Sequence, residues 1–121
     1  MIGWPVIGYG AALTAVAALL ALLATGDRRR PVLALGVLAG AAAPVAWNAI
    51  LRATHAAEFF TDAPLAVLPA SWQDTGSGVF ALAAVILALG VGPARRDSAG
   101  RLALRAVAVG VATFAVDVYL Y

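Results

Sequence analysis

The chain has 121 residues, of which 64% are hydrophobic and 12% are charged. A soluble domain is about 45–50% apolar and about 25% charged, and a chain this short cannot bury so much apolar surface in a water-soluble core. Its net charge of +2 comes from arginine without any lysine. Because those arginines flank apolar runs, they indicate membrane topology and lipid-phosphate contacts, and no nucleic-acid partner is expected.

Four apolar runs predict an all-α integral membrane protein with one domain over residues 1–121. Each run is long enough, or nearly so, to cross a hydrocarbon core of about 30 Å as an α-helix. The expected helices cover about residues 4–25, 32–51, 76–92 and 102–121. Positive charge follows the first run and does not precede it, so we interpret this run as a retained helix and not as a signal peptide. The third helix lengthens if the segment from Trp72 also enters the membrane, and Asp74, Thr75 and Ser77 are its candidate N-caps.

Seven of the eight arginines lie in or beside the turns that join helices 1–2 and 3–4. They are Arg28, Arg29, Arg30, Arg95, Arg96, Arg101 and Arg105. The positive-inside rule places these turns, at residues 26–31 and 93–101, in the cytoplasm, with both termini and the 52–75 loop outside. Arg105 lies one turn inside its helix and is expected to reach back to lipid phosphates. The Ala, Gly, Arg and Pro bias suggests a bacterial plasma membrane.

Two patterns bear on how the helices pack. The spacing Trp-x-x-x-Gly-x-Gly at Trp4 recurs 68 residues later at Trp72, which suggests two hairpins related by an axis along the membrane normal. Chance matching of common residues is the alternative. Gly36 and Gly40 form a small-residue ridge that would let another helix approach closely, unless they simply face lipid.

The 52–75 loop holds the chain's one histidine and three of its six carboxylates. Residues 56–61 are expected to continue the second helix, and the apolar run 65–68 between Pro64 and Pro69 is too short to span a membrane. We expect a short interfacial helix or lid in the headgroup boundary, with a re-entrant segment as the alternative.

Candidate ligand- or partner-binding residues lie in this loop and at the adjoining helix ends. They are Trp47, Asn48, Arg52, His55, Glu58, Asp62, Trp72, Asp74 and Asp117. His55 and Glu58 would share one helical face. One histidine with scattered acids is a poor metal-ligand set, so neither a metal nor another cofactor is expected. Ser71 and Ser77 are interpreted as helix caps and not as nucleophiles.

Asp117 is the one carboxylate inside a predicted membrane helix, where ionisable groups are functional candidates. Asn48 should lie at a similar depth on the second helix. We expect Asn48 and Asp117, with Arg52 as a further member, to form a polar cluster beneath the loop. The alternative is that each is solvated separately among the headgroups.

In size and helix number the chain is similar to the small multidrug resistance transporters. Those proteins carry a glutamate buried in the first helix, whereas no charge lies here between Trp4 and Thr25, so membership is not indicated. The favoured function is a non-enzymatic accessory or assembly subunit within a larger membrane complex, with other membrane subunits or copies of itself as partners. A small homo-oligomeric transporter or channel is the alternative, and an outer-face lipid-binding or lipid-modifying protein is the second.

Overall fold

The computed structural model describes residues 2–120, which form four long α-helices and one short 3₁₀-helix. In chain order they are α1 (Trp4–Ala24), α2 (Arg30–Ala53), η1 (Ala57–Phe60), α3 (Trp72–Val91) and α4 (Ala99–Tyr119). All four α-helices are long and apolar enough to cross a membrane. The predicted all-helical class, with four helices of membrane-spanning length and composition, is therefore confirmed.

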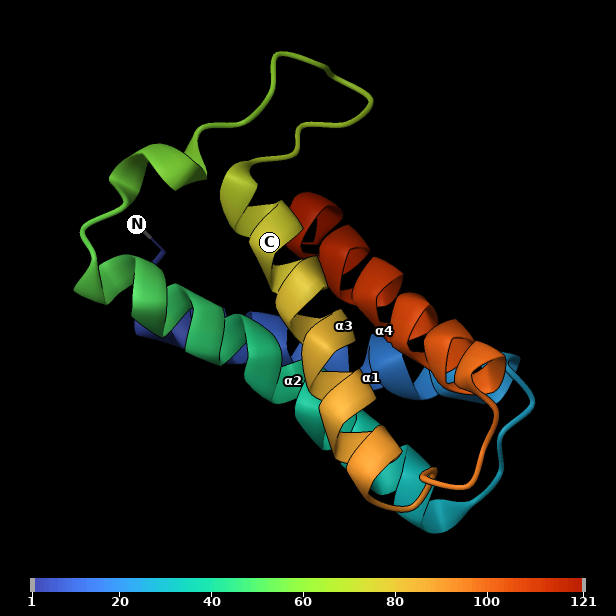
Figure 1. Cartoon of the computed structure of the whole chain (residues 1–121). Helices are drawn as coiled ribbons and strands as arrows, with labels where there is room; N and C mark the ends of the chain where they lie inside the picture. Colours follow the sequence, from blue (N-terminus) through green and yellow to red (C-terminus); the bar gives the residue numbers. More distant parts are fainter. Residues whose placement is uncertain (1, 121) are drawn as a thin grey trace.

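The helices form a bundle in which α1 and α3 each contact both α2 and α4 (Figure 1). The two short turns, at residues 25–29 and 92–98, lie together at one end of the bundle, which we name the turn end. Residues 54–71 lie at the opposite end, which we name the loop end. The candidate site residues of the sequence lie almost entirely at the loop end.

Capping chemistry sets where α3 begins. The Ser71 hydroxyl accepts a hydrogen bond from the Asp74 amide at 3.2 Å, and the Asp74 carboxylate accepts one from the Ser71 amide at 2.8 Å. This reciprocal capping box starts the helix at Trp72, ahead of the predicted start at Gly76. None of the three candidate N-caps is the N-cap, which is Ser71, so that prediction was wrong: Asp74 acts from the first turn, and Thr75 and Ser77 lie further inside the helix.

The end of α2 differs from the prediction that residues 56–61 continue this helix. α2 ends at Ala53, and His55 has a positive φ of 56°. A left-handed residue directly after a helix stops its hydrogen-bond ladder and redirects the chain. The prediction was wrong, because η1 is a separate short helix with its own direction.

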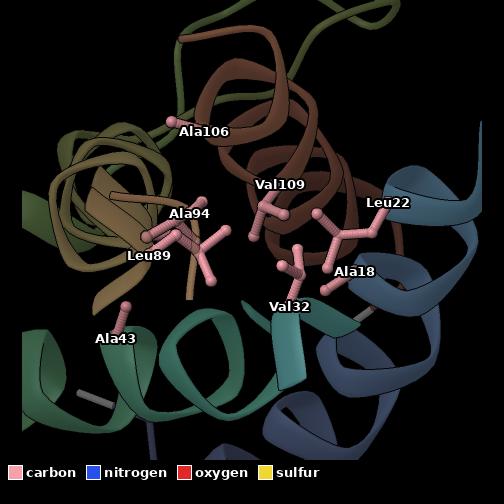
Figure 2. Packing of buried hydrophobic residues seen from close by; sticks show 10 residues of the cluster. Ala18, Leu22, Val32, Ala43, Leu89, Ala94, Ala106 and Val109 are labelled. Carbon is pink, nitrogen blue, oxygen red and sulfur yellow. The ribbon is translucent and has the colours of Figure 1, made fainter. Parts of the chain in front are cut away.

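Small apolar side chains fill the middle of the bundle (Figure 2). The labelled members are Ala18, Leu22, Val32, Ala43, Leu89, Ala94, Ala106 and Val109. A Cβ at Gly36 would stand 2.7 Å from Leu22 Cδ1, and one at Gly40 would stand 2.8 Å from Val109 Cγ1. The small-residue ridge of α2 therefore packs inside the chain, against α1 and α4, and allows their close approach.

Candidate functional site

Four buried polar side chains meet at the loop end, and we name them the Gln73 cluster. Gln73 Nε2 lies 3.4 Å from Asn48 Oδ1, 3.3 Å from Ser77 Oγ and 3.2 Å from Asp117 Oδ2. An amide has two hydrogens, so these three acceptors share them. The cluster joins α2, α3 and α4 through side chains that are each at least nine-tenths buried.

The backbone of α2 orients the cluster. Asn48 Nδ2 donates to the Pro44 carbonyl at 2.8 Å, one turn earlier. This bond turns the Asn48 oxygen toward the Gln73 amide, where it can accept. The backbone carbonyl of Gln73 in turn accepts from Trp47 Nε1 at 3.0 Å. Neighbouring residues of α2 therefore hold both ends of Gln73.

Trp47 has a packing role at this site. A Cβ at Gly76 would overlap the indole ring, so the ring lies directly on the α3 backbone. Its centroid is 5.0 Å from that of Phe80 and 6.1 Å from that of Phe59. These distances are typical of favourable tilted aromatic pairs. Trp47 thus packs from α2 against both α3 and η1 and holds these three elements together at the loop end.

An open cavity of about 250 Å³ adjoins the Gln73 cluster. It lies between the 60–69 segment and the ends of α3 and α4, and its lining residues are Ile2, Phe60, Asp62, Pro69, Ser71, Gln73, Asp74, Asp117 and Val118. Three of these residues are carboxylates, and Asp74 is already engaged in the cap. A water molecule takes about 30 Å³, so the cavity accommodates several waters or a small hydrogen-bond-donating or cationic group.

Arg52 lies outside this cluster, contrary to the expected grouping. Its guanidinium sits 4.8 Å from the centre of the Trp4 ring, a cation–π contact, and it donates to the carbonyl of Ile2. Arg52 thus ties the end of α2 to the start of α1. Asn48 and Asp117, the other two expected members, are brought together through Gln73.

Three further candidates lie outside the cluster. His55, Glu58 and Trp72 are exposed, and none of them lines the cavity beside Gln73. His55 follows α2 and Glu58 lies in η1, so the expectation that they share a helical face was wrong. Within residues 2–120, no three His, Cys, Asp or Glu side chains gather closely enough to hold a metal ion.

Gln73 and Ser77 are the cluster members that the sequence analysis did not assign to a site. The missed signal is the Ser71-x-x-Asp74 spacing, which resembles a capping box and starts the helix at Trp72. With that start, Gln73 and Ser77 are one turn apart on the same helical face. A helix that starts at Gly76 would leave Gln73 in the solvated loop, where a polar side chain is ordinary.

A second set of charged side chains joins the two turns at the turn end. Arg29 pairs with Asp27 at 2.9 Å and with Asp97 at 2.6 Å. Arg105 pairs with the same two carboxylates at 2.7 and 2.6 Å. Arg105 and Asp27 are buried. Arg105 therefore binds carboxylates of its own chain and does not reach back toward lipid phosphates, which corrects that prediction.

These pairs shift the acidity of both carboxyl groups. The hydrogen bond from Arg29 is the largest cause that lowers the pKa of Asp27, from 3.8 to about 2, while burial opposes it. The same guanidinium lowers the pKa of Asp97. Both carboxylates raise the pKa of Arg29. Asp27, Asp97 and Arg29 stay charged at physiological pH, so the network links the turns under those conditions.

The other five turn-end arginines are all exposed. Arg28 donates to the carbonyls of Leu23 and Asp27, and Arg95 donates to the carbonyl of Gly92. The remaining exposed members are Arg30, Arg96 and Arg101. Lipid-phosphate contact by these arginines stays a prediction.

Comparison of the chain with protein-family models, curated proteins and solved structures gave no significant match.

Proposed function

We propose that this protein is a non-enzymatic accessory or assembly subunit that packs within a larger complex of a bacterial plasma membrane. In this proposal the basic turn end faces the cytoplasm and the loop end faces outward, which the positive-inside rule supports. Residues 54–71 would cover the outer end as a lid. Partners would be the lipid bilayer and other membrane subunits or copies of the same chain.

Two hairpins, α1–α2 and α3–α4, form the scaffold in this proposal. Supporting this repeat, α1 and α3 begin at Trp4 and Trp72, which are 68 residues apart. α2 and α4 begin at Arg30 and Ala99, which are 69 residues apart. Near-equal offsets are what two hairpins of one repeat would have, as in parallel membrane repeats.

The observation that carries the proposal is a fixed, apolar, exposed loop. The Ala63 amide donates to the Ala70 carbonyl at 2.8 Å, which closes the loop, and the Tyr119 hydroxyl donates to the Val67 carbonyl at 2.6 Å, which ties it to α4. At its tip Leu65 is 58% exposed and Val67 is 85% exposed. Large apolar side chains held at a surface favour burial against another molecule.

The remaining polar features favour a structural role over chemistry within one chain. Gln73 bonds to its neighbours in the cluster, and the turn-end ion pairs are formed within the chain. The interior between these two ends is filled by apolar side chains such as Ala81, Val85 and Val109, which are fully buried. The lid surface is then the feature best suited to a partner.

Affinity purification in a mild detergent tests the proposal. Wild type should retain a stoichiometric membrane partner, and the Leu65→Ser/Val67→Ser variant should lose it, because the apolar contact is removed. Ala66→Ser is the matched control in the same loop and should keep the partner. A wild-type chain that purifies without any stoichiometric partner, or a partner equally bound by the double variant, would contradict the proposal.

A homo-oligomeric transporter is the second candidate, and the acid-lined cavity beside Asp117 favours it. Ionisable groups in membrane helices commonly serve ion or proton coupling. Flux of protons or small organic cations into proteoliposomes should then appear with wild type and fall with Asp117→Asn. Absence of flux with wild type would remove this candidate.

A further inference from the structure

A second polar cavity, of about 300 Å³, lies at the turn end. Both turns and the beginning of α4 contribute to it. Its charged lining residues are Asp27, Arg28, Arg29, Asp97, Arg101 and Arg105. We name it the turn-end pocket. Four guanidinium groups against two carboxylates leave it with a net positive charge.

Ion pairs within residues 2–120 neutralise only part of the positive charge of the turn-end pocket. Asp27 and Asp97 are both occupied by Arg29 and Arg105. Arg28 reaches only backbone carbonyls, at 2.9 Å from Leu23 and 3.1 Å from Asp27. Among residues 2–120, neither Arg28 nor Arg101 has a carboxylate within ion-pair distance. Two exposed guanidinium groups therefore border a pocket whose other charges are held in place.

The backbone at this end is mixed in polarity. α2 and α4 begin here, at Arg30 and Ala99, whereas α1 and α3 end here, so positive and negative helix ends lie close together. The Ser98 hydroxyl also caps α4 by accepting a hydrogen bond from the Arg101 amide. The attraction for an anion therefore comes from the arginine side chains.

We propose that the turn-end pocket binds a phosphate group, carried by the headgroup of an anionic membrane lipid. Guanidinium groups bind phosphate oxygens through paired hydrogen bonds, and basic pockets between membrane helices take lipid headgroups. The pocket lies where membrane-length helices begin, which is the level of the headgroups. The ion pairs of Asp27 and Asp97 hold Arg29 and Arg105 in position before any ligand arrives.

Lipid titration of the purified full-length chain in a non-ionic detergent tests this site. The probes are dihexanoyl phosphatidylglycerol, dihexanoyl phosphatidylcholine and inorganic phosphate, and isothermal titration calorimetry measures their binding. The wild type should bind the anionic lipid more tightly than the zwitterionic one. An arginine at such a surface contributes on the order of fivefold, so Arg28→Gln/Arg101→Gln should weaken binding by roughly 25-fold.

The matched control is Arg95→Gln/Arg96→Gln, which removes the same charge from the same end but outside the pocket. It should weaken binding by less than about threefold, because charges beyond the site are screened by salt. Equal weakening by both double variants, or equal affinity for the two lipids, would overturn the proposal. Arg28 and Arg101 are exposed, and thermal melts of the variants confirm that they fold.

Inorganic phosphate separates the two sources of the phosphate group. Displacement of the lipid by inorganic phosphate, lost in Arg28→Gln/Arg101→Gln, would support the site and identify free phosphate as a ligand. Lipid binding that inorganic phosphate does not displace would support the site and assign it to the lipid headgroup. Lipid binding that chloride abolishes as readily as phosphate at equal ionic strength would overturn phosphate recognition.

Discussion

At Gly76 the indole of Trp47 occupies the space in which a side chain would stand. Gly76→Ala should therefore force Trp47 away from α3 and strain its hydrogen bond to the Gln73 carbonyl. Overpacking of this kind costs about 1–3 kcal/mol. Unfolding titration in mixed micelles should show that loss of stability.

The control for this substitution is Gly8→Ala. Gly8 stands in α1 where Gly76 stands in α3, but a Cβ at Gly8 meets nothing within 4 Å. Alanine there should leave stability unchanged or raise it by up to about 1 kcal/mol, because alanine favours the helix. If Gly76→Ala unfolds at the same point as Gly8→Ala, the contact with Trp47 does not limit the packing.

Gln73 concentrates the polar contacts of the loop end on one side chain. Gln73→Leu keeps much of the volume but leaves Asn48 and Asp117 without the amide donor that each now has. Removing one partner from a buried polar group costs about 1–3 kcal/mol. The free energy of unfolding, measured by denaturant titration, should fall by that amount. Trp72→Leu, at the exposed neighbouring position, should change it much less, and an equal effect of the two substitutions would argue against the cluster.

At the scale of elements, the two turns are linked by ionic contacts that depend on pH. The folded pKa of Asp27 is about 2, against an ordinary value of 3.8. A carboxyl group with a lowered folded pKa stabilises the fold above its unfolded pKa, and this contribution is lost as pH falls through the folded value. The melting temperature should therefore decline between about pH 4 and pH 2.

Asp27→Asn checks the origin of that decline. The variant should be less stable near neutral pH and should show a shallower slope in acid, because one titrating member of the network is gone. Asp97, whose pKa is also lowered, keeps part of the slope. An acid profile of Asp27→Asn identical to that of wild type would show that the network does not control it.

At the scale of the whole molecule, membrane orientation can be measured directly because the chain has no cysteine. Ala66→Cys lies in the exposed loop, and Gly100→Cys lies at the turn end where a Cβ meets nothing within 4 Å. A membrane-impermeant maleimide should label Ala66→Cys in intact cells and Gly100→Cys only after lysis. The reverse pattern would invert the proposed topology.

The membrane-length helices follow from local properties of the chain. Hydropathy and length require only the composition of each segment, so four apolar runs and their arginine-rich turns could be predicted from the sequence. The ends of the helices were harder to predict from the sequence, as the capping box at Ser71 and the left-handed His55 show. Each of those ends depends on one or two residues and not on a run.

The candidate site could be predicted only in part. Asn48 and Asp117 could be expected at one depth, because depth follows from distance along each helix. Which side chain joins them depends on the rotation of each helix about its axis and on its neighbours. In the folded chain Gln73 lies between Asn48 and Asp117, whereas Arg52 lies against the ring of Trp4.

The same reason explains the turn end. That arginines gather there could be predicted from the chain alone, since their positions beside apolar runs suffice for that conclusion. Helix packing was needed to turn Arg105 inward to Asp27 and Asp97, while Arg28 and Arg101 remain without a carboxylate partner in the described chain. Ion pairs form between turns that are distant in sequence, and their partners are chosen by helix packing and not by local composition.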